Sequence, residues 1–159
     1  MGEKSRPKMR NPVHLVAFGF GSGLLPKAPG TYGSLVGVPV YLLIRSLSTG
    51  YYLITVLAAF VLGVWICERT SRDLGVHDHQ GIVWDEIVGY LVAMAAAPTG
   101  WGWVVVGFLL FRWFDIVKPW PIRWIDNKVG GGLGIMLDDL LAGIFAAVAM
   151  ALLDYTGWF

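Results

Sequence analysis

Five acidic residues interrupt apolar sequence at three places in the chain. Two are adjacent at the start of an apolar stretch (Asp85, Glu86), two are adjacent inside another (Asp138, Asp139), and one ends a third (Asp115). Carboxylates in apolar surroundings are unfavourable, and neighbouring carboxylates repel each other unless a cation compensates them. Because no thiol and no evident histidine ligand accompanies these oxygens, the pattern favours a hard divalent cation, with Mg²⁺ the predicted ion.

Two basic residues accompany Asp115. Arg112, Asp115 and Lys118 recur at three-residue spacing, so they share one face of a helix that Pro119 then ends. A surface ion-pair ladder would have the same spacing. Two cations beside one acid, however, are better suited to an anionic ligand bound together with a metal ion. Arg112 and Lys118 are therefore predicted to contact a phosphate group.

A loop rich in glycine and proline, residues 19–34, precedes the first long apolar stretch. It lacks the Gly-Lys-Ser/Thr ending of a Walker A motif, and no strand-helix-strand unit surrounds it as a dinucleotide fingerprint requires. Thr31 or Ser34 is predicted to cap the following helix, whose N-terminus attracts anions, and Lys27 adds a full positive charge. Capping alone is the simpler alternative; the prediction is that Lys27 and Thr31 also contact phosphate.

These residue types together predict phosphoryl transfer. A carboxylate-bound Mg²⁺ keeps positions free for phosphate oxygens and water, while lysine and arginine neutralise charge that develops during reaction. Other phosphatase chemistries lack their motifs, since Cys67 does not begin a Cys-x5-Arg loop and no Asp-x-Asp-x-Thr sequence occurs. His14, His77 and His79 do not form the paired Arg and His motifs of histidine-dependent membrane phosphatases, and the last two are expected to be solvated.

Five apolar stretches must position these residues, and each is predicted to be a helix: residues 33–47, 51–67, 82–97, 101–114 and 133–153. Short neutral turns alternate with longer charged loops between them. Residues 87–111 include no charged side chain and could form one long helix or a hairpin that turns at the Pro-Thr-Gly sequence of residues 98–100. The hairpin is favoured, because it keeps nearly all lysines and arginines on one side of a membrane, together with Asp85 and Asp115.

The composition is typical of a membrane protein. Of the 159 residues, 56% are hydrophobic and 14% are charged, and the mean hydropathy is +0.63. A soluble all-helical domain with an unusually rich core is the alternative. The net charge of +1 and the scattered basic residues argue against nucleic-acid binding. Six tryptophans lie near the proposed helix ends, as interfacial anchors do: Trp101, Trp103, Trp113, Trp120, Trp124 and Trp158.

The predicted fold is therefore an all-α integral membrane bundle of about five short transmembrane helices, with polar loops and the active site on the cytoplasmic side. We expect a single domain over residues 1–159, in which residues 1–12 form a basic N-terminal tail and residues 13–154 form the membrane-embedded catalytic part. Cys67 is expected to be an inert packing residue, since a single cysteine excludes an internal disulfide. No oligomeric state is predicted.

Four motifs in order carry a family resemblance. They are GSG and APGTYGSL within residues 21–35, IVWDE at residues 82–86, FRWFD and KPWP within residues 111–121, and GGLG, DD and AG within residues 131–143. In these motifs the chain resembles the phosphatidylglycerophosphatase A family. The resemblance extends over roughly residues 14–147, and no motif position is lost.

The resemblance implies a multi-pass, Mg²⁺-dependent enzyme of the bacterial inner membrane with its active site facing the cytoplasm. The implied reaction hydrolyses a phospholipid, phosphatidylglycerophosphate, to phosphatidylglycerol and inorganic phosphate. By match to the motifs, the implied catalytic residues are Asp85, Glu86, Asp115, Asp138 and Asp139. The expected metal ligands among them are Asp85, Glu86, Asp115 and Asp139. The residues expected to contact the phosphate are Lys27, Thr31, Arg112 and Lys118.

Two mechanisms and two other functions stay open at this point. A carboxylate could draw a proton from an attacking water, or an aspartate could form a covalent phosphoryl intermediate. From a different class, the acids could form the ion site of a membrane cation-transport protein, since intramembrane carboxylates also mark ion pathways. Against transport, the acids gather near one face and do not run across the bilayer. A purely structural membrane protein is the third option.

Overall fold

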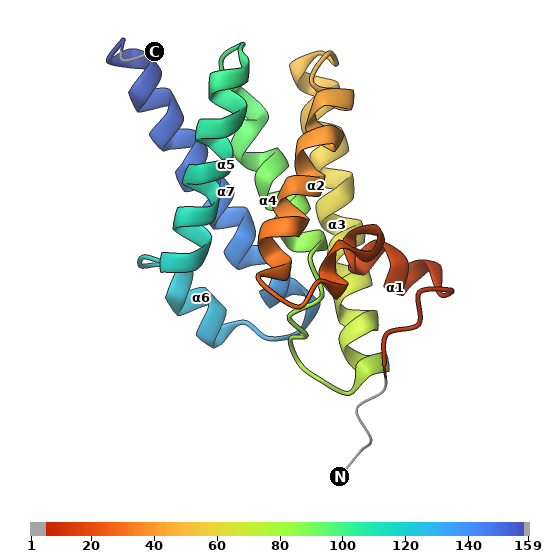
Figure 1. Ribbon diagram of the computed structural model, residues 1–159. Helices are drawn as coiled ribbons and strands as arrows, with labels where there is room; N and C mark the ends of the chain where they lie inside the picture. Colours follow the sequence, from red (N-terminus) through yellow and green to blue (C-terminus); the bar gives the residue numbers. More distant parts are fainter. Residues whose placement is uncertain (1–5, 158–159) are drawn as a thin grey trace.

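The computed structural model describes residues 6–157, and all regular secondary structure in this range is helical (Figure 1). Five long helices run side by side: α2 (Pro29–Ile44), α3 (Thr49–Leu74), α4 (Trp84–Ala93), α5 (Trp101–Val117) and α7 (Gly131–Tyr155). Two short helices, α1 (Pro12–Ala17) and α6 (Ile122–Lys128), and two 3₁₀ segments, η1 (Gly19–Leu24) and η2 (Met94–Ala96), complete the described part. The all-α class is confirmed, but the count of five helices is not, because the described residues form seven α-helices.

Each predicted apolar stretch contains a long helix, but the boundaries differ. The largest difference is in α3, which was expected to end at residue 67 and continues for two further turns. Two ion pairs four residues apart stabilise these turns: Arg72 lies 2.7 Å from Glu68, and Arg69 lies 3.2 Å from Asp73. The helix then ends at Gly75, whose φ of 68° suits a left-handed C-cap. The charged loop predicted here is therefore partly helical.

The two short helices were missed because their apolar runs are too brief to show a period. Helix α1 has Pro12 at its first position, and the Asn11 side chain accepts a 3.0 Å hydrogen bond from the Val13 N–H. Helix α6 follows Pro121 inside the predicted charged loop. Both short helices lie at the same end of the bundle, α1 beside α3 and α6 beyond the end of α5 (Figure 1).

The uncharged stretch of residues 87–111 forms a hairpin, as predicted. Helix α4 continues into η2, Ala97 is extended (ψ 137°) ahead of a proline, and Gly100 has a φ of 130° before α5 begins. A proline disfavours helical backbone at the preceding residue, and the Gly100 conformation is one that side-chain-bearing residues rarely adopt. The chain therefore reverses. The start of α4 and the end of α5, which carry the acids, lie at the same end of the bundle (Figure 1).

Helix α4 lies in the interior and packs closely against α7. Its residues Ile87, Val88 and Tyr90 are almost fully buried. The two helices meet at a pair of glycines, where a Cβ atom added to Gly143 would lie 2.4 Å from the carbonyl oxygen of Gly89. No side chain fits in that space, so the missing Cβ sets the distance between the acid-bearing helices.

The outward faces of the long helices are apolar. Two helices, α3 and α7, are long and apolar enough by length and composition to cross a membrane. Large hydrophobic side chains with more than half of their surface exposed include Leu43, Ile54, Leu57, Leu109, Val148 and Leu152. Many large apolar side chains on these helices therefore lack contacts inside the bundle. Of the tryptophans expected at helix ends, Trp103 is buried, Trp101, Trp113, Trp120 and Trp124 are exposed, and Trp158 lies outside the described residues.

The glycine contact between α4 and α7 gives a first prediction. Gly143→Val places carbon atoms inside the Gly89 carbonyl contact, and overpacking of this kind costs about 1–3 kcal/mol of stability. We expect a lower thermal midpoint in detergent than for the matched control Ala151→Val, at an exposed position of the same helix. Equal midpoints for the two variants would contradict the role assigned to this contact.

Candidate active site

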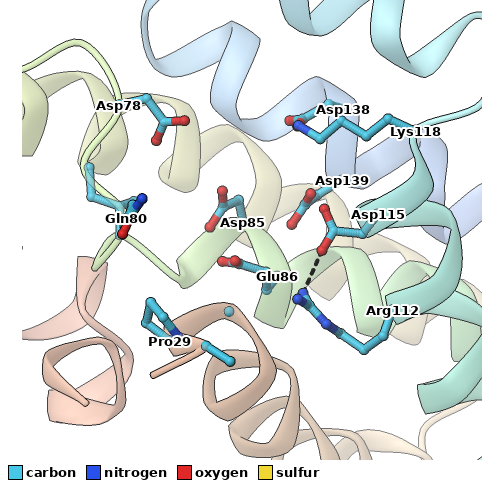
Figure 2. A pocket seen from close by; sticks show the side chains of 13 residues that line it. Pro29, Asp78, Gln80, Asp85, Glu86, Arg112, Asp115, Lys118, Asp138 and Asp139 are labelled. Carbon is cyan, nitrogen blue, oxygen red and sulfur yellow. Dashed lines mark hydrogen bonds and ion pairs between the residues drawn. The ribbon is translucent and has the colours of Figure 1, made fainter. Parts of the chain in front are cut away.

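One cavity of about 380 Å³ collects the acidic residues of three helices (Figure 2). All five acids predicted from the sequence line it: Asp85, Glu86, Asp115, Asp138 and Asp139. Arg112 and Lys118 line it as well. A sixth acid, Asp78, also lines the cavity. When all of these groups are ionised, the cavity has six negative and two positive side chains, an excess of four negative charges. The cavity therefore suits a ligand or ion that brings positive charge.

The helices place these side chains at one end of the bundle. Asp85 and Glu86 occupy the first turn of α4, Asp115 lies in the last turn of α5, and Asp138 and Asp139 lie two turns into α7. Both aspartates of the α7 pair face the cavity, as Figure 2 shows. Adjacent side chains on a helix point about 100° apart, so the two carboxylates enter the cavity from different directions.

Two ion pairs hold part of the cluster. Arg112 donates to Asp115 at 2.5 Å from one turn earlier on α5, and both side chains are largely buried (Figure 2). The Lys118 ammonium lies 2.6 Å from Asp138 and 2.9 Å from Asp126. Partial burial alone would lower the pKa of Lys118, but Asp138 and Asp126 outweigh it and raise the pKa above its usual range, so Lys118 stays charged at neutral pH.

The backbone conformation at Lys118 explains the direction in which its side chain points. Lys118 caps α5 with a φ of 46°, in the left-handed region, and Pro119 follows. The chain turns sharply there, and the lysine side chain reaches back toward α7 (Figure 2). The end of α5 thus supplies both a structural turn and the cation that contacts Asp138.

Several carboxylate oxygens in the cavity have no partner. Asp85 Oδ1, Glu86 Oε2, Asp138 Oδ1 and Asp139 Oδ2 are buried and make no hydrogen bond to any described residue. Two sets of ligand atoms lie within 4.8 Å of one another, one from Asp85, Glu86 and Asp139, the other from Asp115, Asp138 and Asp139. Buried, unpartnered, all-oxygen donors at this spacing fit a hard divalent cation. Asp139 belongs to both sets, so it occupies the centre of the cluster.

The N-terminus of α2 forms another wall. Ala28, Pro29 and Gly30 line the cavity, and a Cβ on Gly30 would lie 2.2 Å from Glu86 Oε1. The first turn of α2 thus approaches Glu86 closely, and the positive end of its dipole faces the cavity.

The two loop residues predicted to contact phosphate, Lys27 and Thr31, do not line the cavity, and their contact with phosphate stays a prediction. The capping prediction was wrong. The helix begins at Pro29, so Thr31 already lies in its first turn and Ser34 lies inside it, where the Ser34 hydroxyl donates to the Gly30 carbonyl at 2.9 Å. Ala28 takes the cap position in a left-handed conformation without a side-chain cap bond.

Two cavity residues, Asp78 and Gln80, were missed by the sequence analysis. They belong to the loop between α3 and α4, and their only signal was a polar position shortly before the acids at the start of α4. Asp126, which the sequence left unassigned, borders a smaller adjoining cavity with Asp85 and Asp138 and holds Lys118 from α6. These residues extend the polar lining beyond the predicted set.

The start of α7 is fixed by side chains from elsewhere in the chain. Glu68 Oε2 accepts from the Gly132 N–H at 2.6 Å, and His77 Nε2 accepts from the Gly131 N–H at 3.0 Å. No side chain of Gly130 can cap the helix, so Glu68 and His77 satisfy N–H groups that would lack partners. This contact anchors the helix that carries Asp138 and Asp139.

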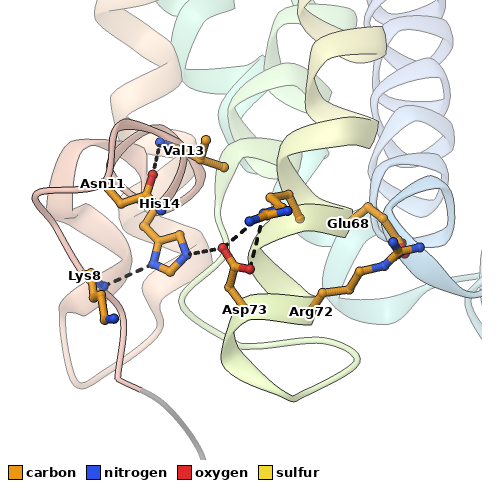
Figure 3. Close-up of polar contacts among 8 residues, drawn as sticks. Lys8, Asn11, Val13, His14, Glu68, Arg72 and Asp73 are labelled. Carbon is orange, nitrogen blue, oxygen red and sulfur yellow. Dashed lines mark hydrogen bonds and ion pairs between the residues drawn. The ribbon is translucent and has the colours of Figure 1, made fainter.

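His14 and Cys67 lie outside the acidic cavity. His14 is buried beside α3, where its ring contacts Asp73 at 3.3 Å and accepts from the Lys8 N–H at 3.1 Å (Figure 3). Cys67 is fully buried and packs against Met136, with their sulfurs 3.8 Å apart. His14 therefore holds the N-terminal segment to α3. Cys67 is a packing residue, as expected.

Comparisons with known proteins agree on one family. A sequence profile described as Phosphatidylglycerophosphatase A matches residues 15–154. Phosphatidylglycerophosphatase A of Escherichia coli is 51% identical over 145 residues, which cover 91% of this chain and 84% of that protein. Phosphatidylglycerophosphatase A of Haemophilus influenzae is 48% identical over 147 residues, covering 91% and 90%.

A protein named for a different lipid phosphate is also similar. The putative phosphatidylinositol-3-phosphatase of Bacteroides thetaiotaomicron is 37% identical over 145 residues, covering 86% of this chain and 90% of that protein. No solved structure gives a significant match. Every acid of the cavity lies within the region that the family profile matches.

The lysine contact gives the second prediction. Lys118→Met leaves the buried Asp138 without its cation, and we expect the free energy of unfolding to fall by about 1–3 kcal/mol. Asp126→Asn removes only the more exposed partner and should cost less than about 1 kcal/mol. Denaturant titration of both variants measures the difference. If Lys118→Met were no more destabilising than Asp126→Asn, the contact with Asp138 would not stabilise the fold.

Proposed function

The chain belongs to the phosphatidylglycerophosphatase A family, and from this premise we propose that it hydrolyses the terminal phosphate of phosphatidylglycerophosphate. The products are phosphatidylglycerol and inorganic phosphate. One observation carries the proposal: the acids of three separate helices meet in one cavity with Arg112 and Lys118. Carboxylates that can hold a divalent ion, together with cations that can face phosphate oxygens, are the groups that phosphoryl transfer needs.

The proposed cofactor is Mg²⁺. Asp85, Glu86 and Asp139 are the first candidates for its ligands, because none of them has a cationic partner among the described residues and their oxygens lie within 4.8 Å of one another. Asp115 adds a further oxygen near Asp139. A bound Mg²⁺ would offset the excess negative charge and polarise a phosphate oxygen.

The chain's own residues then have separate tasks. Arg112 and Lys118 each keep a carboxylate partner and face the cavity, where they can neutralise charge on the equatorial phosphate oxygens. Asp138 bonds Lys118 through Oδ2 and leaves Oδ1 unpartnered, so Oδ1 is the proposed acceptor of a proton from the attacking water. The water oxygen bonds to phosphorus, the bond to the alcohol oxygen breaks, and the alcohol leaves with the proton that Asp138 accepted.

A covalent phosphoryl-aspartate is the alternative route. It would transfer the phosphoryl group to a carboxylate oxygen before water attacks. Rapid quenching with lipid labelled at the terminal phosphate should leave the protein unlabelled if water attacks phosphorus directly.

We place the protein in the bacterial inner membrane, with the cavity facing the cytoplasm. Support comes from the apolar outward faces and from the two helices long enough to span. At the cavity end of the bundle, the end of α3 and α6 carry Arg69, Arg72, Arg123 and Lys128, and the segment before α1 carries Arg6, Lys8 and Arg10, whereas Arg45 lies at the opposite end of α2. In this orientation the headgroup reaches the acids while the acyl chains stay in the bilayer.

A cation-transport role fits the cluster less well. The acids lie together at one end of the helices, and the small cavity at the opposite end, lined by Tyr41, Arg45, Thr49 and Tyr52 among others, has no carboxylate among its described lining residues. A transport pathway would place polar groups along the whole bundle. Release of inorganic phosphate by purified protein separates the two functions.

The third prediction concerns Asp139, the acid shared by both sets of ligand atoms. Asp139→Asn should lower Mg²⁺-dependent phosphate release from phosphatidylglycerophosphate by about 100-fold to 1,000-fold, because it removes a charged ligand from the centre of the cluster. Asp154→Asn, an exposed position on the same helix, should keep normal activity. Phosphate release is measured with and without a chelator, and phosphatidylinositol 3-phosphate is tested beside it.

The outcomes separate the parts of this proposal. Near-normal turnover by Asp139→Asn would remove Asp139 from the catalytic set. Full activity in the presence of excess chelator would refute the proposed requirement for Mg²⁺. A wild-type preference for phosphatidylinositol 3-phosphate would keep the reaction class and change the substrate.

The fourth prediction tests the membrane location. Wild-type protein should stay in the membrane fraction after an alkaline carbonate wash. Leu57→Arg, on the exposed face of α3, should lower the membrane-integrated amount, since an arginine near the bilayer centre costs about 2.5–3.5 kcal/mol. Leu57→Ala is the matched control and should behave as wild type. Release of the wild-type protein by the wash would contradict the membrane assignment.

A further inference from the structure

The chain turns from α5 into α6 at one corner of the bundle (Figure 1). Residues at this corner line a second hollow, of about 410 Å³, beside the acidic cavity. Lys118 borders both spaces. Trp120, Arg123, Trp124 and Asn127 contribute the larger side chains of this hollow. Unlike the acidic cavity, it has no carboxylate in its lining. The acidic cavity, which is rich in carboxylates, and this hollow, which has none in its described lining, therefore share Lys118.

The hollow combines apolar surface with an available cation. Trp120 is 81% exposed and Trp124 is 56% exposed, which is unusual for side chains of this size. Arg123 donates one bond, from Nη2 to the Val117 carbonyl at 3.2 Å, and forms no ion pair with a described residue. Its remaining guanidinium donors can therefore bind an anion, while the indole rings can cover an apolar or glycerol portion of the same ligand.

One occupant matches this combination, namely the rest of the substrate. Phosphatidylglycerophosphate carries two phosphate groups, the terminal monoester and an internal phosphodiester, joined through a glycerol unit and followed by the diacylglycerol part. With the monoester in the acidic cavity, the phosphodiester would lie on the far side of Lys118. On that side the described lining has no carboxylate. It has the Arg123 guanidinium instead, and the indole rings of Trp120 and Trp124 form part of the wall.

We propose that the hollow at the α5–α6 corner binds the internal phosphodiester and adjoining glycerol of the lipid substrate, with Arg123 as a specificity-determining residue and Trp124 as an apolar contact. The inference rests on the proposed function, since it assigns a second part of the same substrate. It goes further by stating that the enzyme distinguishes lipid phosphates with an internal diester from those without one. The diester contact lies outside the reaction centre, so it supplies selectivity through binding.

Three substrates isolate the contact. Phosphatidylglycerophosphate has both phosphates and acyl chains, phosphatidic acid has a monoester and acyl chains but no diester, and glycerol 3-phosphate has the monoester alone. For Arg123→Gln we expect kcat/KM on phosphatidylglycerophosphate to fall about tenfold to one hundredfold, the loss expected for a charge-assisted hydrogen bond, with phosphatidic acid and glycerol 3-phosphate unchanged. Arg123→Lys should recover part of the activity. Trp124→Ala should lower kcat/KM for both lipids and leave glycerol 3-phosphate unchanged.

The control is Lys128→Gln, which removes a cation from an exposed position of the same helix outside the hollow and should change none of the three substrates. An equal loss on every substrate for Arg123→Gln would mean that Arg123 only supports the α5–α6 corner, and it would overturn the proposal. Unchanged kinetics on phosphatidylglycerophosphate would overturn it as well. Wild-type protein that releases no phosphate from any lipid would instead refute the proposed function, and that result is seen before any variant is compared.

Discussion

Repulsion among carboxylates is the constraint that shapes this molecule. Asp138 and Asp139 are almost fully buried, and they share a cavity with three more acids that come from other helices. Such groups cannot all ionise in an apolar environment without compensating charge. Arg112 and Lys118 offset part of the charge, and each does so by contacting a carboxylate directly. Unpartnered oxygens still remain on four of the five acids, which is why the cluster favours a divalent cation.

The fold holds this unfavourable cluster together through contacts that lie away from it. The glycine contact between α4 and α7 brings the second turn of α4 against the middle of α7. Glu68 and His77 fix the start of α7 from the loop and helix that precede α4. Gly30 lets the N-terminus of α2 approach Glu86 without a side chain between them. The apolar packing of the bundle therefore supplies the stability that the acidic groups remove.

The presence of the five long helices and most of the acidic cluster could be predicted from the sequence. Long apolar runs identify helices because few other elements can bury them, and acids inside such runs stand out as functional. The hairpin at residues 98–100 could be predicted because proline and glycine act locally on the backbone. These local signals are enough to predict that Asp85 and Asp115 lie at the same end of the bundle.

What the sequence could not supply depends on contacts between distant segments. The extension of α3 beyond residue 67 relies on ion pairs that look like an ordinary charged loop in the sequence. Asp78 and Gln80 reach the cavity only because their loop folds against it. The capping of α2 by Thr31 or Ser34 was mispredicted for a related reason: the helix start depends on Pro29 and on a left-handed Ala28, and neither carries a side-chain cap signal.

The position of the cluster at one end of the bundle is also compatible with the proposed reaction on a lipid substrate. The helices present apolar side chains outward along their length, yet the acids and cations meet where α1, α6 and the end of α3 surround the bundle. A headgroup can enter there without its acyl chains leaving an apolar environment. The turn at Lys118 joins the two requirements, because the same residue ends α5, contacts Asp138 and borders the aromatic hollow of α6. A shift of this turn would therefore alter charge compensation in the cavity and access to it together, which makes the α5–α6 corner the point where fold and proposed chemistry are most closely linked.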